Sequence, residues 1–195
     1  MARRSTHTKE ELRTLIVDAA TRLVRTNGLS GWSARQLAAA INYSPGTLYN
    51  VFDNLDEILF EIEANVLNDL AEAIAMRPLT GEPRADLDSM VALYTSAVYR
   101  EPRLWQLVFR DDLSSDVERH PSHREQCEAL RKALRAALGA VMEAATPEDV
   151  DSATDTLWCS LFAMMALSTS DKFVELDAPR LNALARRLVS GQINA

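Results

Sequence analysis

Apolar residues recur at intervals of three and four almost throughout this chain, and this spacing restricts the fold more than any other feature. Between residues 8 and 26, the apolar positions from Leu12 to Val24 fall along one face of a helix. Similar spacing returns in later segments, and no stretch alternates between apolar and polar residues as a half-buried strand does. We therefore expect an all-α protein of about nine helices with a substantial buried core.

Capping and helix-stopping residues divide the first part of the chain into expected helices. Serine and asparagine favour helix starts, because their side chains accept hydrogen bonds from free amide groups of the first turn. Glycine and asparagine tolerate the left-handed conformation in which many helices end. The signals are Asn27-Gly28 after the helix of residues 8–26, Ser33 with Gln36 as a capping box, Ser44-Pro45, and Asn54 with Glu57 before a helix that runs to about Ala75.

Proline-marked turns divide the rest of the chain into further helices. The expected segments are helices over residues 85–100 and 103–112, a polar loop over 113–122, a long helix ended by Thr146-Pro147, a helix over 150–165, and a last helix opened by Asp177-Ala178-Pro179. We expect residues 1–53 to form a three-helix helix-turn-helix domain. Residues 54–195 would form a larger helical body.

Charge is unevenly distributed along the chain. The net charge is −7, yet residues 1–52 carry seven basic and three acidic side chains, so the acidic excess lies in the remainder. A positive N-terminal segment can approach phosphate groups while an acidic body stays away from them. The charge pattern is therefore compatible with nucleic-acid binding by the first part of the chain alone.

The apolar segments and the cysteines indicate whether the chain crosses a membrane and in which compartment it functions. No apolar segment follows the first residues, and the longest apolar stretch, residues 157–167, is too short to cross a bilayer. Cys127 and Cys159 lie in apolar helical patterns, where we expect buried free thiols. We therefore expect a cytoplasmic protein with no membrane partner.

Residues 33–52 contain two short expected helices joined by a tight turn. Asn42 would occupy the turn, and Leu48 and Phe52 would anchor the second helix in the core. An ordinary helical hairpin with a solvated polar face has the same spacing, so the spacing alone leaves DNA binding and this simpler interpretation equally open. The small and polar groups that the second helix would expose, as for close approach to the major groove, are Ser44, Gly46, Thr47, Tyr49 and Asn50.

The segment from Gly28 to Phe52 resembles the DNA-binding domain of the tetracycline-repressor (TetR) family, and the resemblance extends over residues 9–59. The matching residues are Gly28-Leu29, Ser33, Arg35, Leu37-Ala38, Ser44-Pro45-Gly46-Thr47-Leu48-Tyr49 and Phe52. The resemblance implies a homodimeric transcriptional regulator, a repressor in the reading we adopt. Its N-terminal domains would bind a palindromic operator in double-stranded DNA, and its body would bind a small-molecule effector.

Carried over by position, the resemblance also implies which residues contact DNA. Arg35, Tyr43, Ser44, Pro45, Gly46 and Thr47 would face bases, Ser33, Ser44 and Tyr49 would hold phosphates, and Arg3 and Arg4 would reach the minor groove. Three positions depart from the family pattern: Asn42 replaces the usual glycine, Val51 a frequent histidine and Leu55 the usual lysine. Because that lysine would contact a phosphate, we expect weaker non-specific affinity with DNA binding retained.

Aromatic and methionine side chains gather on the expected helices of the body. Most should fill the core, but buried tryptophan and tyrosine need partners for their polar atoms, and apolar walls with a few polar groups are typical of ligand pockets. Together with the resemblance, they suggest a pocket for a small, largely apolar effector. The candidate lining residues are Met90, Tyr94, Trp105, Phe109, Trp158 and Phe162.

Other polar clusters favour ordinary roles. His120-Pro121-Ser122-His123 lies near several acids, but a metal site needs more ligands at defined positions, so we interpret it as a surface loop. The cysteines have no neighbouring ligand pattern, which favours packing over redox sensing. Since no phosphate-binding loop, catalytic triad or carboxylate pair stands out, we expect neither an enzyme nor a cofactor.

Residues 157–167 would be apolar on nearly every side of a helix, which is more than one small body can cover. We therefore expect a two-fold dimer through the last two helices, with Leu181, Leu184 and Leu188 beside this stretch. One alternative stays open, because Val51 and Leu55 also suit a helical ligand- or protein-binding module with impaired DNA binding. The intact polar set around Thr47 favours the regulator.

Overall fold

The computed structural model describes residues 7–110, 121–170 and 177–193, and every regular element within these ranges is helical. The elements are α1 (Lys9–Asn27), a short 3-10 helix η1 (Leu29–Gly31), α2 (Ala34–Ala40), α3 (Pro45–Leu48), α4 (Leu55–Met76), α5 (Pro83–Arg100), α6 (Pro102–Val108), α7 (Pro121–Val141), α8 (Pro147–Ser168) and α9 (Ala178–Ile193). The expected all-α fold is confirmed. None of the helices in the described ranges has the length and apolar character needed to span a membrane.

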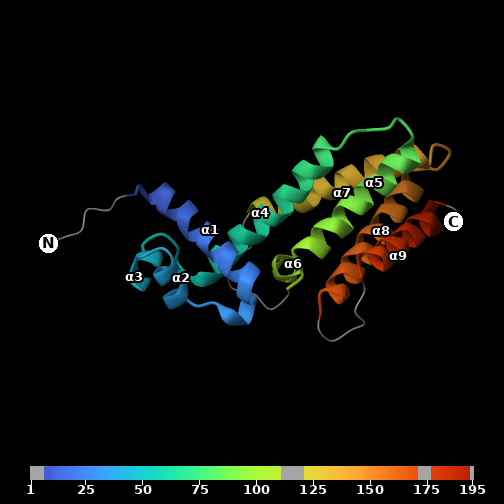
Figure 1. Cartoon of the computed structure of the whole chain (residues 1–195). Helices are drawn as coiled ribbons and strands as arrows, with labels where there is room; N and C mark the ends of the chain where they lie inside the picture. The colour runs from blue at the N-terminus through green and yellow to red at the C-terminus, as the bar shows by residue number, and fades with distance from the viewer. Residues whose placement is uncertain (1–6, 111–120, 171–176, 194–195) are drawn as a thin grey trace.

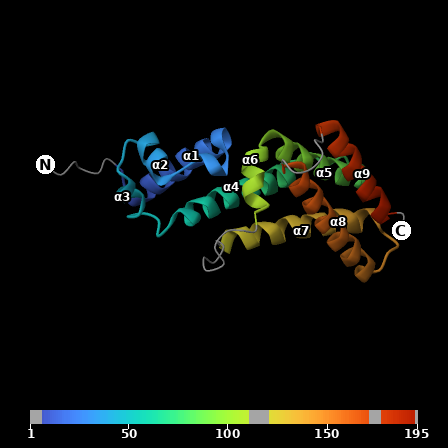
Figure 2. The same ribbon diagram turned by 90° about the horizontal axis from the view of Figure 1, so that it is seen from below.

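Helix α4 joins an N-terminal head, α1–α3, to a body formed by the later helices (Figure 1). Its first half packs in the head core through Ile58 and Ile62, and its second half packs in the body core through Leu70 and Ile74. The view in Figure 2 shows the same arrangement, with the head at one end of α4 and α8 and α9 at the far end of the body. A displacement of α4 therefore moves both cores.

Helix α6 also contributes to both cores, although it is short. Leu104 and Leu107 pack with the head, whereas Trp105 and Val108 pack with the body. The reason is the helical period: residues three apart share a face, and α6 lies between α1 and α4 with a different face toward each core. Sequence spacing did not predict this double role.

Several expected helix starts are observed. Thr8 caps α1 with a reciprocal box, in which the Thr8 amide donates to Glu11 at 2.7 Å and the Glu11 amide donates to the Thr8 hydroxyl at 3.2 Å. Asn54 accepts from the Glu57 amide at 3.0 Å. At Ser33 the box is incomplete, because the Gln36 side chain accepts from the Ser33 hydroxyl and not from its backbone.

Several expected boundaries are wrong: α7 already ends at Val141, and α8 extends from Pro147 to Ser168. Helix α5 begins at Pro83 and not at Ala85, because a proline without an amide hydrogen fits the first turn of a helix. Helix α6 ends at Val108 and not at residue 112, since the Phe109 amide already bonds back to Trp105 and Leu107 as a helix end does. Most of the expected loop at 113–122 lies outside the described residues, but Pro121 already opens α7.

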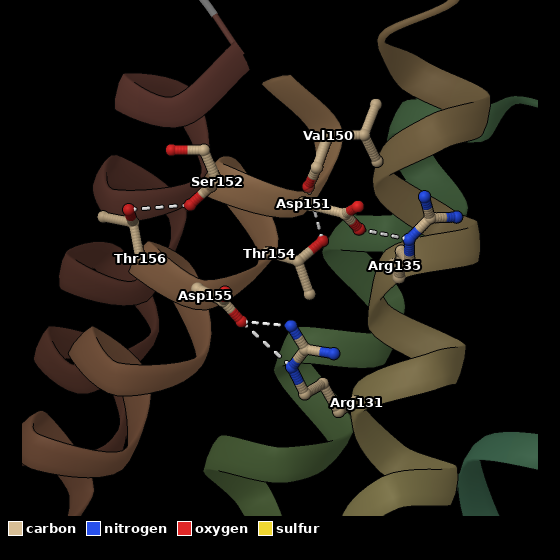
Figure 3. Close-up of polar contacts among 8 residues, drawn as sticks. All are labelled: Arg131, Arg135, Val150, Asp151, Ser152, Thr154, Asp155 and Thr156. Atoms are coloured by element: carbon tan, nitrogen blue, oxygen red, sulfur yellow. Dashed lines mark hydrogen bonds and ion pairs between the residues drawn. The ribbon is translucent and has the colours of Figure 1, made fainter. Parts of the chain in front are cut away.

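Surface ion pairs connect α7 to α8 (Figure 3). Arg131 donates to Asp155 with Nε at 3.0 Å. Arg135, one turn later on α7, donates to Asp151, one turn earlier on α8. Between them, the buried Thr154 hydroxyl donates to the Val150 carbonyl at 2.7 Å. The two pairs bridge helices that both line the cavity described below, and they favour one register of α7 against α8.

Candidate nucleic-acid interface and body cavity

The turn between α2 and α3 has the geometry expected from the sequence. Asn42 has φ 59°, and it is the only non-glycine residue with positive φ among the described residues. The Tyr43 amide donates to the Ala38 carbonyl at 2.9 Å and closes the turn. Because asparagine tolerates this left-handed conformation better than most residues, Asn42 can stand where the family has glycine.

Helix α3 is a single turn anchored by apolar side chains at its C-terminal end. Leu48 and Phe52 are each 1% exposed and belong to the head core. The Ser44 hydroxyl lies 3.1 Å from the Thr47 hydroxyl and makes no bond to the helix backbone, so both oxygens stay at the exposed N-terminal end of α3.

The residues expected at DNA form one mostly exposed set on α2 and α3. Tyr43 and Thr47 are half-buried, and the exposed members are Ser33, Arg35, Ser44, Pro45, Gly46, Tyr49 and Asn50. Arg3 and Arg4 lie outside the described residues. His7, just before α1, has its Nδ1 2.8 Å from the Tyr43 hydroxyl, which links the start of the described chain to this face.

Arg13 on α1 fixes the recognition segment, and the sequence analysis missed it. Its guanidinium lies 4.3 Å from the centre of the Phe52 ring, its Nε donates to Glu61 of α4 at 2.6 Å, and an Nη contacts the Val51 carbonyl at 3.4 Å. Its partners are 38 to 48 positions away in the chain. No local pattern could indicate such a contact.

Two of the three positions that depart from the family pattern, Val51 and Leu55, serve packing. Val51 is 8% exposed within the head core, and Leu55 is half-buried against the same core. Each thus contributes apolar contact where the family pattern would supply a polar group. Neither side chain offers a phosphate contact.

The body contains a cavity of about 420 Å³ between α4, α5, α6, α7 and α8. Its walls include all six residues that the sequence analysis selected, Met90, Tyr94, Trp105, Phe109, Trp158 and Phe162. Four of them form a continuous aromatic row, with ring centres 5.5 Å apart for Tyr94 and Trp105, 5.6 Å for Trp105 and Phe109, and 5.0 Å for Phe109 and Phe162. The volume lies within the range of small-molecule pockets.

Aliphatic and polar wall residues were not expected from the sequence. Leucines and an isoleucine on α4 and α7 form much of the apolar wall, and a leucine in a cavity has the same sequence pattern as one in a core. The polar wall residues are Arg110, His123 and Cys127. Burial raises the pKa of the Tyr94 hydroxyl, and the nearby Cys127 thiol acts in the same direction, so Tyr94 stays neutral.

The interpretation of His123 as surface is wrong. His123 belongs to α7, its side chain is 15% exposed, and its Nε2 lies 2.7 Å from Oε1 of Glu63, which is 1% exposed. His120 lies outside the described residues. Within the described part of the chain, no group of three or more His, Cys, Asp or Glu side chains has an arrangement that could hold a metal ion.

The start of α6 touches the end of α1. Arg103 donates to the backbone carbonyls of Arg25, at 3.3 Å, and of Thr26. Arg25 in turn donates from Nε to Glu101 at 2.9 Å. The last residues of α6 line the cavity, so this helix links the cavity to the head.

Helix α8 leaves apolar side chains uncovered. Phe162 is 43% and Leu167 45% exposed. Cys159 is exposed as well, so the expectation that both cysteines are buried is wrong for Cys159, which lies on the side of α8 that faces away from the body core. Leu181 of α9 is 2% exposed within its own body core, so it cannot lie on an outer face as expected.

Comparison with known proteins agrees with this geometry. The model for the family described as bacterial regulatory proteins, tetR family, matches residues 16–62, which span α2, α3 and parts of α1 and α4. No curated protein sequence matches the chain.

Solved structures of TetR-family proteins share the fold. A transcriptional regulator from Rhodococcus sp. RHA1 is 17% identical with a TM-score of 0.68, over 95% of this chain and 97% of that one. A regulator from Streptomyces coelicolor is 16% identical with a TM-score of 0.69, over 94% and 79%. FadR from Thermus thermophilus, a transcriptional repressor solved with lauroyl-CoA, is 21% identical with a TM-score of 0.64, over 93% of each chain. The present chain therefore carries a TetR-family helix-turn-helix domain at its N-terminus and has the fold of TetR-family transcriptional regulators.

Proposed function

We propose that this protein is a homodimeric transcriptional repressor that a small, largely apolar molecule releases from a palindromic DNA operator. The observation that carries the proposal is the exposed polar end of α3, held on a buried apolar anchor inside a TetR-family domain. We assign residues 1–53 to DNA binding and residues 54–195 to effector binding and dimerisation. Among the similar structures, BioQ was solved with its DNA operator and RolR with resorcinol, which supports both halves of the proposal.

In the DNA complex, Arg35 and residues 43–47 read bases, while Ser33, Ser44 and Tyr49 hold phosphates. The exposed N-terminal end of α3 is the part that enters the major groove, as in other helix-turn-helix proteins. Arginine can bond two acceptors of a guanine edge, and a threonine methyl can contact thymine. Arg3 and Arg4 add sequence-independent contacts to the duplex.

The test of DNA binding is a gel-shift with DNA from upstream of the protein's own gene, at two salt concentrations. We expect Arg35→Ala and Thr47→Ala each to weaken specific binding by about 1–3 kcal/mol and to leave the fold intact. Arg22→Ala is the matched control, because Arg22 is exposed on the far stretch of α1 and also loses one positive charge. If Arg35→Ala bound as tightly as the control, the assigned reading face would be wrong.

The effector acts through the two helices that belong to both cores. A ligand beside the second half of α4 and against Trp105 of α6 displaces both helices relative to the head. The two heads of a dimer must match the spacing of successive major grooves, so a small displacement loses contacts. A tenfold loss of operator affinity needs only about 1.4 kcal/mol of differential binding between the two conformations.

Coupling between the sites must be reciprocal, and this gives the test of effector action. Trp105 and Trp158 line the cavity, so quenching of their fluorescence reports its occupancy. A ligand found by such a screen is titrated with and without operator DNA. Equal affinity in the two titrations would leave a DNA-binding protein and contradict the effector mechanism.

The dimer forms through α8 and α9. Phe162 and Leu167 supply exposed apolar surface on α8, and the half-buried Leu184 and Leu188 of α9 lie next to it in the proposed contact. Burial of such surface against a two-fold copy removes apolar area from water. Light scattering at micromolar concentration should show a dimer, and a monomer would contradict this part of the proposal.

The second candidate function is that of a helical ligand- or protein-binding module with impaired DNA binding. It is favoured by the apolar packing of Val51 and Leu55 at positions where the family has polar groups. The gel-shift separates the two candidates. Salt-sensitive binding of a specific duplex supports the regulator. Absence of any duplex binding by the folded protein supports the module.

A further inference from the structure

An ion pair lies at one point of the largely apolar cavity wall. His123 of α7 forms part of the wall, and Glu63 of α4 lies behind it with Oε1 2.7 Å from Nε2 of His123. Glu63 is 1% exposed, and Oε2 has no hydrogen-bond partner in the described part of the chain. A buried carboxylate without compensation is strongly unfavourable, so Glu63 requires a positive His123 beside it.

The surroundings of His123 keep its ring protonated at neutral pH. Hydrogen bonding to the Cys127 sulfur, 3.9 Å from Nε2, and to the Glu63 carboxylate raises the pKa of His123 to about 9, although burial acts in the opposite direction. The other titratable or charged groups on the wall are Tyr94 on α5 and Arg110 after α6. Glu63 is the carboxylate in contact with the ring.

The protonated ring of His123 has two N–H donors, and only Nε2 contacts a partner among the described residues. Nε2 faces Glu63 and Cys127, whereas Nδ1 makes no hydrogen bond within the described residues. A protonated imidazole donates from both nitrogens, and a donor at a partly desolvated wall favours an acceptor from a ligand. A cationic ligand group would instead meet the positive charge of His123 at the same place on the wall.

We propose that the effector is an amphipathic acid, with an apolar body along the aromatic row and a carboxylate-type head that accepts a hydrogen bond from Nδ1 of His123. In this site His123 is the binding residue, and Glu63 is a positioning residue that fixes the ring and its charge. The inference rests on the proposed function in one respect, that the cavity holds the effector.

The first experiment compares three probes with the same tail: decanoate, decanol and decylamine. Binding to the full-length protein is followed by calorimetry and by tryptophan quenching without DNA. We expect decanoate to bind at least about tenfold more tightly than the other two, as a charge-assisted hydrogen bond predicts. Decylamine binding as tightly as decanoate, or no saturable binding of decanoate, would overturn the proposal.

Variants then test whether His123 causes the preference for decanoate. Because His123→Leu leaves a buried carboxylate without its partner and can destabilise the fold, the double variant Glu63→Met with His123→Leu removes both charges together. In the double variant we expect decanoate to lose its advantage while decanol binding is kept. Arg124→Leu, an exposed position on the same helix, is the matched control and should bind like wild type. A retained preference for decanoate in the double variant would overturn the assignment.

The role of Glu63 is read from the pH dependence of decanoate binding. In the wild-type protein we expect nearly constant affinity between about pH 6 and about pH 8, and in Glu63→Gln an affinity that falls across this range as the ring loses its proton. Equal pH profiles would overturn the positioning role. Operator binding is measured separately. A wild-type protein that binds its operator but shows no preference for decanoate therefore counts against this inference and not against the regulator.

Discussion

Arg13→Ala should loosen the recognition segment and lower the free energy of unfolding. Arg13 joins three parts of the head: it belongs to α1, stacks on the Phe52 ring that follows α3, and pairs with Glu61 of α4. Alanine cannot replace any of these contacts. Since Phe52 anchors the end of the recognition segment, its looser support should also weaken operator binding.

The expected magnitude follows from the contacts and their exposure. An arginine over an aromatic face contributes about 0.5–1 kcal/mol when exposed and about 2 when desolvated, and the Arg13 side chain is 38% exposed. The ion pair with Glu61 contributes about 0.5–1 kcal/mol at this partial exposure. The total is a loss of about 1–2 kcal/mol, or a fall in Tm of about 3–6 °C for a chain of this length.

Urea unfolding at a fixed protein concentration measures this loss, because dimerisation makes stability depend on concentration. Arg22→Ala is the control, since it makes the same substitution on the same helix at an exposed position. A double-mutant cycle of Arg13→Ala and Glu61→Ala should give a coupling of about 0.5–1 kcal/mol. If Arg13→Ala unfolds and binds DNA like Arg22→Ala, the assigned role of Arg13 is refuted.

Three further outcomes can be measured. Folding raises the pKa of His123 to about 9 from about 6.5. The contribution of His123 to stability is therefore fully present below about pH 6.5 and is lost as the pH rises through 9. Urea titrations of the wild-type protein should show stability falling from about pH 6.5 to about pH 9 relative to the double variant Glu63→Met with His123→Leu, and equal pH profiles would contradict this. Arg103→Ala should speed hydrogen exchange at the end of α1, whose carbonyls Arg103 binds, and unchanged exchange there would argue against the contact. Arg135→Ala should leave the Tm close to that of the wild-type protein, because Arg135 and Asp151 are both solvent-exposed, and a clear fall in Tm would show that the pair is stronger than its exposure indicates.

The helix-turn-helix segment was predictable in detail because its signals are local. The cap at Asn54 and the turn at Asn42 each involve atoms within a few residues of one another. The exposed or half-exposed state of the proposed DNA-contacting residues also follows from the helical period once Leu48 is placed in the core. The same locality explains why the length of α6 was overestimated: periodic apolar residues continued to Phe109, but the chain had already turned.

The cavity was predictable only in part. Large aromatic side chains stand out in a sequence, and all six chosen residues lie on the wall. The aliphatic wall could not be selected, because whether a leucine borders a cavity or fills a core depends on the distance between helices. His123 was misread for a similar reason, since its partner Glu63 lies 60 positions earlier on a helix with no pattern that marks it.

The sequence by itself determined the all-α class, most helix boundaries and the recognition segment, because periodicity, caps and turn conformations depend on neighbours within about four residues. Only the tertiary structure decided that α4 and α6 belong to two cores, that Arg13 supports the recognition segment and that Glu63 holds His123 at the cavity wall. Each of these joins residues from different helices. Such contacts arise when helices pack, and packing geometry depends on the whole set of side chains between them.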